Sequence, residues 1–365
     1  MKKPNHPARL GGSLLLALLC LEFAPMAHAG GEEFALCAKK YPDSNAERLK
    51  CYDNAQAAAT VSDLPQPEDD PEDDEETPPA TAPAPMVARS YLTRTWNLDD
   101  RTSHDESKLG RLIPHRLNYL LVRKTFNANN RPVSPAVGNN TLVPEDIDAL
   151  ETKFQLSFKK DIGSQHDINF GDFKTLRVWG AYTQQSNWQV LNTRNSSPFR
   201  ETNYEPELIA TFGTGDTSGL KLVNLGLVHQ SNGKRSPESR SWNRIYLQGG
   251  WEWNNSTSIM ARGWWRIPEN SLKDDNPDIA DYIGRADLVA RWEPMDKSQA
   301  VAVLLRNNLR WTQNRGFVQV DWSTPIALGN AVRVHAQLTS GFGESLIDYN
   351  HRQNTLGLGF SFREW

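Results

Sequence analysis

The chain of 365 residues lacks the long apolar segment that a membrane-spanning helix needs. Such a helix requires roughly 18 consecutive apolar residues, and no run of that kind follows the N-terminal leader. An excess of one charge is also missing, since 40 Lys and Arg are balanced by 44 Asp and Glu. This balance does not indicate a nucleic-acid partner. The modest hydrophobic content of 38% still suits a transmembrane β-barrel, whose strands are apolar on one face only.

The N-terminus has the pattern of a Sec signal peptide. Basic residues precede an apolar run at residues 14–21, and small residues follow up to Ala29. We therefore expect residues 1–29 to be a signal peptide that is cleaved after Ala29; the alternative is a buried helix. Cys20 lies in the apolar run, but Leu19 stands before it where a lipoprotein signal has a small residue, so lipidation is not expected.

Cysteine is scarce, with three in the chain, and removal of the leader leaves Cys37 and Cys51. Two cysteines in an exported chain usually pair in an oxidising compartment. We predict that residues 30–60 form a helical hairpin with this disulfide, which would contribute on the order of 3 kcal/mol. A zinc site is the less favoured alternative, because no His lies nearby.

Residues 61–88 are rich in proline and in acidic side chains, most densely at residues 68–76. Too little apolar surface is present there to offset the entropy lost on ordering the chain. We predict an extended, solvated linker; the alternative is a segment that buffers calcium. The N-terminal extension, residues 30–88, is expected to lie in the periplasm.

From about residue 115 onwards, short segments alternate between apolar and polar residues and are separated by turn residues. In the last segment, for example, Leu356, Leu358 and Phe360 share one face. About twelve such segments are present, an even number, as closed bacterial barrels require. The sequence therefore predicts an all-β fold, a 12-stranded antiparallel transmembrane β-barrel over residues 89–365, preceded by the short helical or disordered extension.

The two faces of these segments differ in chemistry. One face carries many Arg, Gln and Asp residues, which predicts a polar interior network and not an open pore. Soluble sandwiches alternate as well, but they rarely keep charge on one face and aromatic residues near the strand ends of the other. Residues 282–292 are predicted to form one of the strands. Tryptophans expected in interfacial aromatic girdles are Trp188, Trp251, Trp253, Trp265, Trp292 and Trp322.

A His, a Ser and an Asn fall on the apolar faces of two neighbouring predicted strands. In residues 220–231, His229 and Ser231 extend the uninterrupted apolar stripe. In residues 241–253, Asn243 shares the apolar face, and it points the same way if both apolar faces are outward. Residues near the shared loop of an antiparallel pair lie within side-chain reach. We expect these three side chains to meet on the lipid-facing exterior.

These residue types suit nucleophilic catalysis. A Ser hydroxyl needs a base, and a neutral His can remove its proton. An Asn can orient the imidazole by a hydrogen bond without carrying charge. The alternative, from this motif alone, is a polar cap at the end of a strand.

Several blocks of the sequence resemble the outer membrane phospholipase A family. Residues 229–233 (His-Gln-Ser-Asn-Gly) and 239–244 (Ser-Arg-Ser-Trp-Asn-Arg) look like the family's signature. Residues 196–206, 274–279 and 343–350 look like further blocks of it. The similarity runs from roughly residue 90 to the end. It implies calcium-dependent hydrolysis of phospholipid acyl esters in the cell outer membrane, with phospholipase A1, phospholipase A2 and lysophospholipase activity.

The resemblance also implies a role for each residue of the motif. Ser231 would be the nucleophile, His229 the general base and Asn243 the residue that orients it. The Gly233 N–H would stabilise the oxyanion, together with water held by the calcium ion. Gln230 stands where the family often has Glu, and it is expected to face the interior.

Calcium would be bound in the active homodimer. By resemblance, the ligands are the Ser239 side chain, the Lys234 carbonyl and Ser196 of the partner subunit, and calcium accepts such hard oxygen ligands. Lys234 stands where the family often has Arg, and this difference matters little because the ligand is the backbone carbonyl. Ser236 replaces an Asp linked to a second calcium site. That substitution puts this possible second metal site, with Asp275 as its other candidate ligand, in doubt.

Gln184 lies on the apolar face of its predicted strand, where a lone amide is costly in lipid. The resemblance makes it a hydrogen-bonding residue of the dimer interface; the alternative is a strand-end residue among the headgroups. A different class of function, a passive porin or adhesin, would use the same barrel without esterase activity. A soluble lipase is disfavoured because the chain has no Gly-x-Ser-x-Gly elbow.

Overall fold

The structure is a computed structural model that describes residues 40, 51, 89–99, 112–215, 219–326 and 329–362. The chain divides into two units, residues 1–84 and 85–365. The predicted signal peptide, the acidic linker and most of the predicted hairpin lie outside the described residues. Lys40 and Cys51 are helical, and Cys51 forms a disulfide bond. Cys37 lies outside the described residues, so its pairing with Cys51 stays a prediction.

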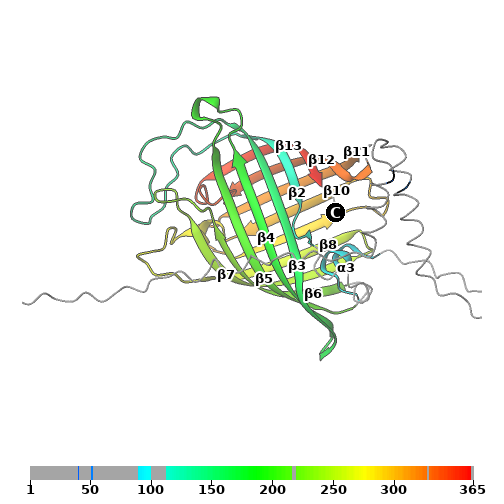
Figure 1. The fold of residues 1–365 in the computed structure, drawn as a ribbon. Helices are drawn as coiled ribbons and strands as arrows, with labels where there is room; N and C mark the ends of the chain where they lie inside the picture. The colour runs from blue at the N-terminus through cyan, green and yellow to red at the C-terminus, as the bar shows by residue number, and fades with distance from the viewer. Residues whose placement is uncertain are drawn as a thin grey trace, which may run out of the picture. The chain divides into compact units, whose positions relative to one another are not determined.

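Twelve antiparallel strands of the second unit form a closed barrel (Figure 1), as predicted. Each strand pairs with the next along the chain, and β13 pairs with β2 to close the ring. A two-residue strand, β1 (Ile113–Pro114), pairs with β3 in addition. The barrel strands are β2 (Asn118–Thr125), β3 (Leu150–Phe170), β4 (Phe173–Trp188), β5 (Phe199–Gly213), β6 (Gly219–Ser231), β7 (Ser241–Trp253), β8 (Thr257–Ile267), β9 (Ala286–Trp292), β10 (Ala300–Asn307), β11 (Gly316–Ile326), β12 (Gly329–Phe342) and β13 (Arg352–Phe362).

Alternation along each strand decides which side chains face the lumen and which face outward. In β4, Arg177 and Trp179 are buried inside the barrel. On the outside of β6 and β7, Leu227 and Leu247 are 47% and 60% exposed. Exposed leucines in a continuous outer band are stabilised by lipid and not by water. Four of the tryptophans predicted for the girdles are exposed at that surface, namely Trp253, Trp265, Trp292 and Trp322.

Charged side chains fill the lumen and pair with one another. Arg123 forms ion pairs with Glu151 and Glu344, and the Lys153 ammonium lies 2.7 Å from a Glu344 oxygen. Buried charges are tolerated only when they are paired and hydrogen-bonded in this way. A cavity of about 420 Å³ remains between these groups. The interior is therefore a polar network, as predicted.

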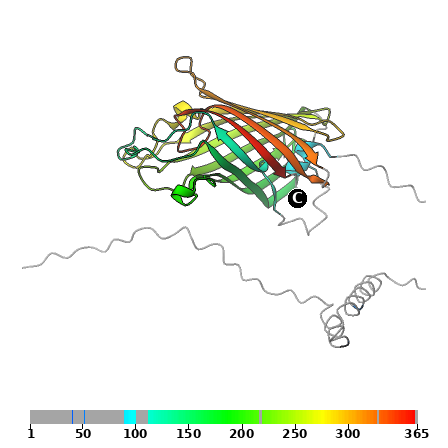
Figure 2. The ribbon, with the colours of Figure 1, turned by 90° about the horizontal axis from the view of Figure 1, so that it is seen from above.

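The two ends of the barrel are different (Figure 2). Long loops lie at one end, and short turns join the strands at the other, as is usual for outer-membrane barrels. Among the described residues, neither helix has the length and hydropathy of a membrane span. The long-loop connections are residues 126–149, 189–198, 232–240, 268–285, 308–315 and 343–351.

Helix α3 (Tyr91–Trp96), which the alternation analysis did not predict, lies inside the barrel near the short-turn end. The Ser90 side chain caps its N-terminus. The Leu92 N–H donates to Glu252, and the Lys159 ammonium lies 3.2 Å from the centre of the Trp96 ring. Both apolar side chains of α3 that point into the lumen, Leu92 and Trp96, are buried. This helix therefore covers part of the lumen at that end.

The prediction of a strand over residues 282–292 is wrong for its first part. Ile279–Tyr282 form a short helix, α4, and β9 begins at Ala286. Gly284 has a φ of +99°, and a Cβ there would lie 2.3 Å from the Asn307 carbonyl oxygen. A backbone of that conformation cannot continue a strand, so the alternation of residues 282–286 is not a strand pattern.

Candidate active site

His229 and Asn243 lie opposite each other on neighbouring strands, on the outer face of the barrel. Strand register pairs the two residues directly across β6 and β7. The His229 Nδ1 and Asn243 Oδ1 atoms are 2.8 Å apart. This contact suits an Nδ1–H that donates to the amide oxygen, which leaves Nε2 free to accept a proton.

Ser231 is the last residue of β6, on the same face as His229. It pairs across the sheet with Ser241 of β7 and with Tyr204 of β5. In the part of the chain that the structure describes, the Ser231 hydroxyl makes no hydrogen bond to His229. Hydrogen bonds of catalytic groups are often long in free enzymes. The ladder between β5 and β6 is interrupted next to His229, at Pro206, which has no N–H to donate.

The loop of residues 232–240 follows Ser231, and its first two residues, Asn232 and Gly233, fix how it leaves the strand. Gly233 has a φ of +64°, and a Cβ there would lie 3.1 Å from Tyr204. The Asn232 amide oxygen accepts from the backbone N–H groups of Arg240, at 3.0 Å, and Lys234, at 3.3 Å. One side chain thus ties the start of the loop to its end and holds the Gly233 backbone beside Ser231.

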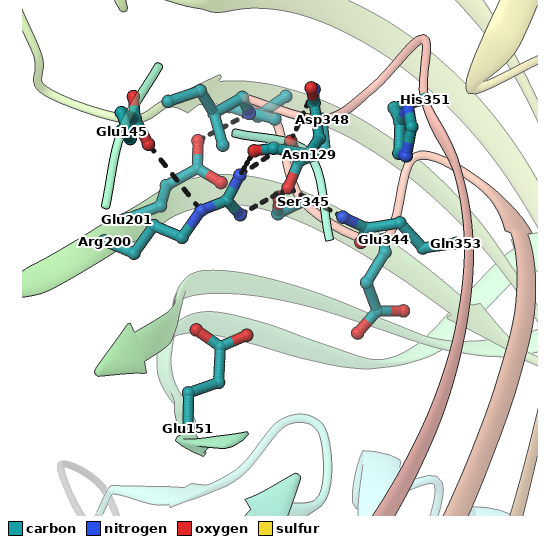
Figure 3. Close-up of polar contacts among 12 residues, drawn as sticks. Asn129, Glu145, Glu151, Arg200, Glu201, Glu344, Ser345, Asp348, His351 and Gln353 are labelled. Carbon is teal, nitrogen blue, oxygen red and sulfur yellow. Dashed lines mark hydrogen bonds and ion pairs between the residues drawn. The ribbon is translucent and has the colours of Figure 1, made fainter. Parts of the chain in front are cut away.

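A buried polar cluster at the long-loop end braces this loop from inside (Figure 3). A Glu201 oxygen accepts from Asn232 Nδ2 at 3.1 Å and from the Ile347 N–H at 2.6 Å. Figure 3 shows Arg200 turned toward Asp348 and Asn129, and it donates to both. Burial by itself raises the pKa of Asp348, but the Arg200 guanidinium outweighs it and lowers the pKa below its ordinary value. The cluster connects β5, the loop of residues 232–240 and the loop of residues 343–351.

Oxygen atoms gather around Ser239, one of the predicted calcium ligands. Its hydroxyl donates to an Asp275 carboxylate oxygen at 2.5 Å, and Asn139 donates to the other oxygen at 3.0 Å. The Ser236 hydroxyl is 2.7 Å from the Asn139 side-chain oxygen. Lys234 forms an ion pair with Glu238 through its side chain, which leaves its carbonyl out of that contact. No cluster of three or more His, Cys, Asp or Glu that could hold a metal is found among the described residues.

Ser196, the ligand predicted for the partner subunit, lies in the connection between β4 and β5 at the long-loop end of the barrel. It follows the short 3-10 helix η3 (Thr193–Asn195) and is exposed. Ser196 and Ser197 have φ values of 60° and 48°, in the left-handed region that non-glycine residues rarely adopt. Ser196 is therefore accessible to another molecule.

Comparison with known proteins identifies the family of this chain. A family model for phospholipase A1 matches residues 92–362. The chain belongs to the phospholipase A1 family. A relative from Neisseria meningitidis serogroup B is 32% identical over 400 residues and covers 99% of each chain.

Two solved structures of the family are also similar. The outer membrane phospholipase A of Escherichia coli is 33% identical, with a TM-score of 0.57, over 68% of this chain and 91% of that one. A Salmonella typhi outer membrane phospholipase, solved as a dimer with bound calcium, is 32% identical, with a TM-score of 0.61, over 76% of this chain and 99% of that one.

This member of the family is a phospholipase of the outer membrane, as the resemblance indicated. The barrel, the enzyme class and the location are thereby confirmed. The roles of the individual residues stay predictions. Gln184, for example, lies on the outer face of β4, where it accepts from the Tyr182 hydroxyl at 3.2 Å and donates to Ser186 at 3.3 Å.

Sequence reasoning missed a fourth polar residue at the site of this phospholipase. Asn243 Nδ2 donates to a Glu269 carboxylate oxygen at 3.0 Å. Burial, and then the nearby Asp274 carboxylate, raise the pKa of Glu269 above its usual value. The strand register explains this contact, because Ile267 pairs with Asn243 and Glu269 lies two residues after Ile267. Only the pairing of β7 with β8 brings it to the site.

Proposed function

We propose that the protein hydrolyses phospholipid acyl esters in a calcium-dependent reaction, through Ser231, His229 and Asn243 on the lipid-facing exterior. The observation that carries this proposal is the 2.8 Å contact between His229 and Asn243 on the outer face, beside Ser231. A pore would place its functional residues in the lumen. A site on the outside suits a substrate that is itself part of the membrane.

Each of the three side chains has a role in the proposed reaction. His229 Nε2 removes the proton of the Ser231 hydroxyl, whose oxygen attacks the acyl carbonyl carbon of the lipid. Asn243 accepts from His229 Nδ1–H and holds the imidazole in the required tautomer. His229 then gives the proton to the lysophospholipid oxygen as the ester bond breaks. Water, activated by His229 in turn, hydrolyses the acyl-serine and releases the fatty acid.

The oxyanion of each tetrahedral intermediate needs hydrogen-bond donors. The Gly233 N–H is the donor that we propose, because its positive φ and its tie through Asn232 fix the backbone beside Ser231. The same loop carries the Lys234 carbonyl and leads to Ser239, so the oxyanion donor and the proposed calcium ligands belong to one segment.

The residues around Ser239 fit a calcium ion. The proposed donors are the Ser239 hydroxyl and the Lys234 carbonyl, hard oxygens of the kind calcium prefers, and an Asp275 carboxylate oxygen is 2.5 Å from that hydroxyl. Ser239 and Lys234 of one subunit would hold the ion together with Ser196 of the partner subunit. When bound, calcium supplies positive charge next to the developing oxyanion. Asp275, the candidate ligand of the second site, is bonded to Ser239 here, and Ser236 supplies no carboxylate to that second site.

Dimerisation would then control activity. The proposed calcium site is not completed by one subunit alone, because the proposed Ser196 ligand comes from the partner subunit. A homodimer through the outer face of β4 brings two Gln184 side chains together in a symmetric contact. The Salmonella typhi relative was solved as a dimer with calcium, which supports the same arrangement here.

Hydrolysis of phospholipid in mixed detergent micelles tests the proposal. We expect the purified full-length protein to release fatty acid with calcium and to lose this activity when calcium is chelated. Ser231→Ala should abolish hydrolysis while the barrel still folds, and Ser256→Ala, on the turn between β7 and β8, should leave it unchanged. Full activity of Ser231→Ala would exclude Ser231 as the nucleophile. The porin or adhesin alternative predicts no hydrolysis in any of these samples.

A further inference from the structure

Glu269 lies immediately behind the proposed catalytic residues. Asn243 pairs with Ile267, the last residue of β8, and Pro268 then ends the strand. Glu269 is half-buried beside the Asn243 amide, and the amide nitrogen is 3.0 Å from its carboxylate. Building on the proposed function, we propose that Glu269 is a positioning residue that selects the active orientation of Asn243 and places a negative charge behind it.

The reason is that an amide can present either of two ends to the imidazole. With its oxygen toward His229 Nδ1, it accepts from Nδ1–H, and Nε2 is free to act as base. With its nitrogen toward Nδ1, it donates, and the proton moves to Nε2, which can no longer accept the Ser231 proton. An Asn alone does not distinguish these two arrangements, whereas an Asp would.

Glu269 removes this ambiguity. A carboxylate only accepts hydrogen bonds, so it binds the amide through its nitrogen and directs the oxygen toward His229. A flipped amide would place its oxygen against the carboxylate, so it would lose the hydrogen bond to Glu269 and meet repulsion between the two oxygens. The charge also counts, because His229 becomes positive during the reaction. The hydrogen bonds from His229 to Asn243 and from Asn243 to Glu269 connect that cation to an anion through the amide of Asn243.

The surroundings of Glu269 support a role in orienting Asn243. Arg266, the nearest cation, has its guanidinium 2.7 Å from Asp274 and also donates to the Pro277 carbonyl. Within the described ranges, Glu269 has no ion pair, and its one hydrogen bond is to Asn243. A residue kept only for stability at this rim would be expected to pair with Arg266.

The test measures kcat and KM for phospholipid hydrolysis by the full-length protein with saturating calcium. Glu269→Gln keeps the size of the side chain but can donate as well as accept, so it loses both the selection and the charge. We expect about a tenfold lower kcat, as for other residues that orient a ligating or catalytic side chain, with KM nearly unchanged. Glu269→Ala should be at least as slow, and Glu269→Asp should recover part of the loss.

A double-mutant cycle with Asn243→Ala separates positioning from a general structural effect. Because Glu269 acts through Asn243, Glu269→Gln should cause no further loss of kcat in the Asn243→Ala background. Asp296→Asn, an exposed carboxylate on the turn after β9, is the control and should behave as wild type. The heat-dependent gel shift of a folded barrel checks that each variant is folded.

The outcomes are distinguishable from those of the proposed function. A wild-type kcat for Glu269→Gln, or the same fold loss with and without Asn243, overturns the role of Glu269 while an inactive Ser231→Ala leaves the catalytic assignment intact. A Glu269→Asp variant no faster than Glu269→Ala also contradicts it. Wild-type protein without hydrolysis, or an active Ser231→Ala, overturns the proposed function and this inference together.

Discussion

Single residues around Ser231 are held by neighbours that come from other strands. His229 contacts Asn243 across β6 and β7, and Asn243 in turn contacts Glu269 beyond β8. Asn232 ties its own loop together and reaches Glu201 on β5. A site at the edge of a bilayer has few packing contacts on its lipid side. These hydrogen bonds from the sheet and from the rim therefore provide most of its rigidity.

At Gly233, the loop conformation itself can be tested. Its φ of +64° disfavours any residue with a Cβ, and that Cβ would press on Tyr204 at 3.1 Å. We expect Gly233→Ala to move the N–H away from the oxyanion and to lower kcat by about 100-fold, the effect of losing one such donor. The cost in folding free energy should be only about 1 kcal/mol.

The matched control is Gly263→Ala, on the outer face of β8, where a Cβ would meet nothing within 4 Å. Phospholipid hydrolysis and thermal unfolding of both variants are the measurements. Gly233→Ala with wild-type kcat would argue against its N–H as the oxyanion donor.

Among the elements, the loop of residues 343–351 and strand β5 are joined by the Arg200–Asp348 pair. Asp348 also accepts from Asn129 at 3.0 Å and from Gln353 at 3.1 Å. The pKa of Asp348 is lowered in the folded protein. Its contribution to stability is therefore complete above its unfolded value of 3.8 and is lost as the pH falls through the lower folded value.

Acidification should thus weaken this end of the barrel at a pH below about 4, and not at neutral pH. We expect Asp348→Asn to remove that acid-sensitive part of the stability. At neutral pH it should also lower the free energy of unfolding by about 3 kcal/mol, because Arg200 loses its buried partner. The measurement is the thermal unfolding midpoint between pH 3 and pH 7, with Asp172→Asn, on the exposed turn between β3 and β4, as the control. Equal pH profiles for Asp348→Asn and wild type would contradict this account.

Considered as a whole, the molecule has a polar, ion-paired lumen and an apolar exterior that carries the chemistry. Leu227 and Leu247 are exposed on the outer face of the strands that carry His229 and Asn243, and Trp265 is exposed on the neighbouring strand β8. Such a surface is stable in lipid or against a second barrel. Gln184 is a polar residue on the outer face of β4, and its hydrogen bonds within the described residues are weak ones to Tyr182 and Ser186.

A second copy of the chain would satisfy the Gln184 amide better than lipid does. We expect Gln184→Ala to weaken the calcium-bound dimer in detergent by about 3- to 10-fold in its dissociation constant, since a hydrogen bond between membrane segments contributes about 1 kcal/mol. Chelation of calcium should favour monomers in wild type as well. Sedimentation in detergent, with Ser340→Ala on the outer face of β12 as control, measures both effects. An unchanged dimer fraction in Gln184→Ala would place the interface elsewhere.

Local sequence was sufficient for much of this architecture. Side chains of a strand alternate strictly, so the residues that face lipid could be identified from pattern alone, and the outward placement of His229, Ser231 and Asn243 was among them. The same rule failed at Tyr282 and Gly284, where the alternation was accidental and a positive φ ended the segment. It also gave no sign of α3, because a helix of six residues is too short to show a period.

Which side chains meet was decided by the tertiary structure. Strand register brings Glu269 to Asn243, and the folding of the loop of residues 343–351 over the barrel rim brings Asp348 to Arg200. These partners are separated by 26 and 148 positions in the chain. No local pattern records such a distance, since it depends on how the strands close into a ring. The residue types at the site were thus evident from the sequence, whereas the contacts that orient them came only with the closed barrel.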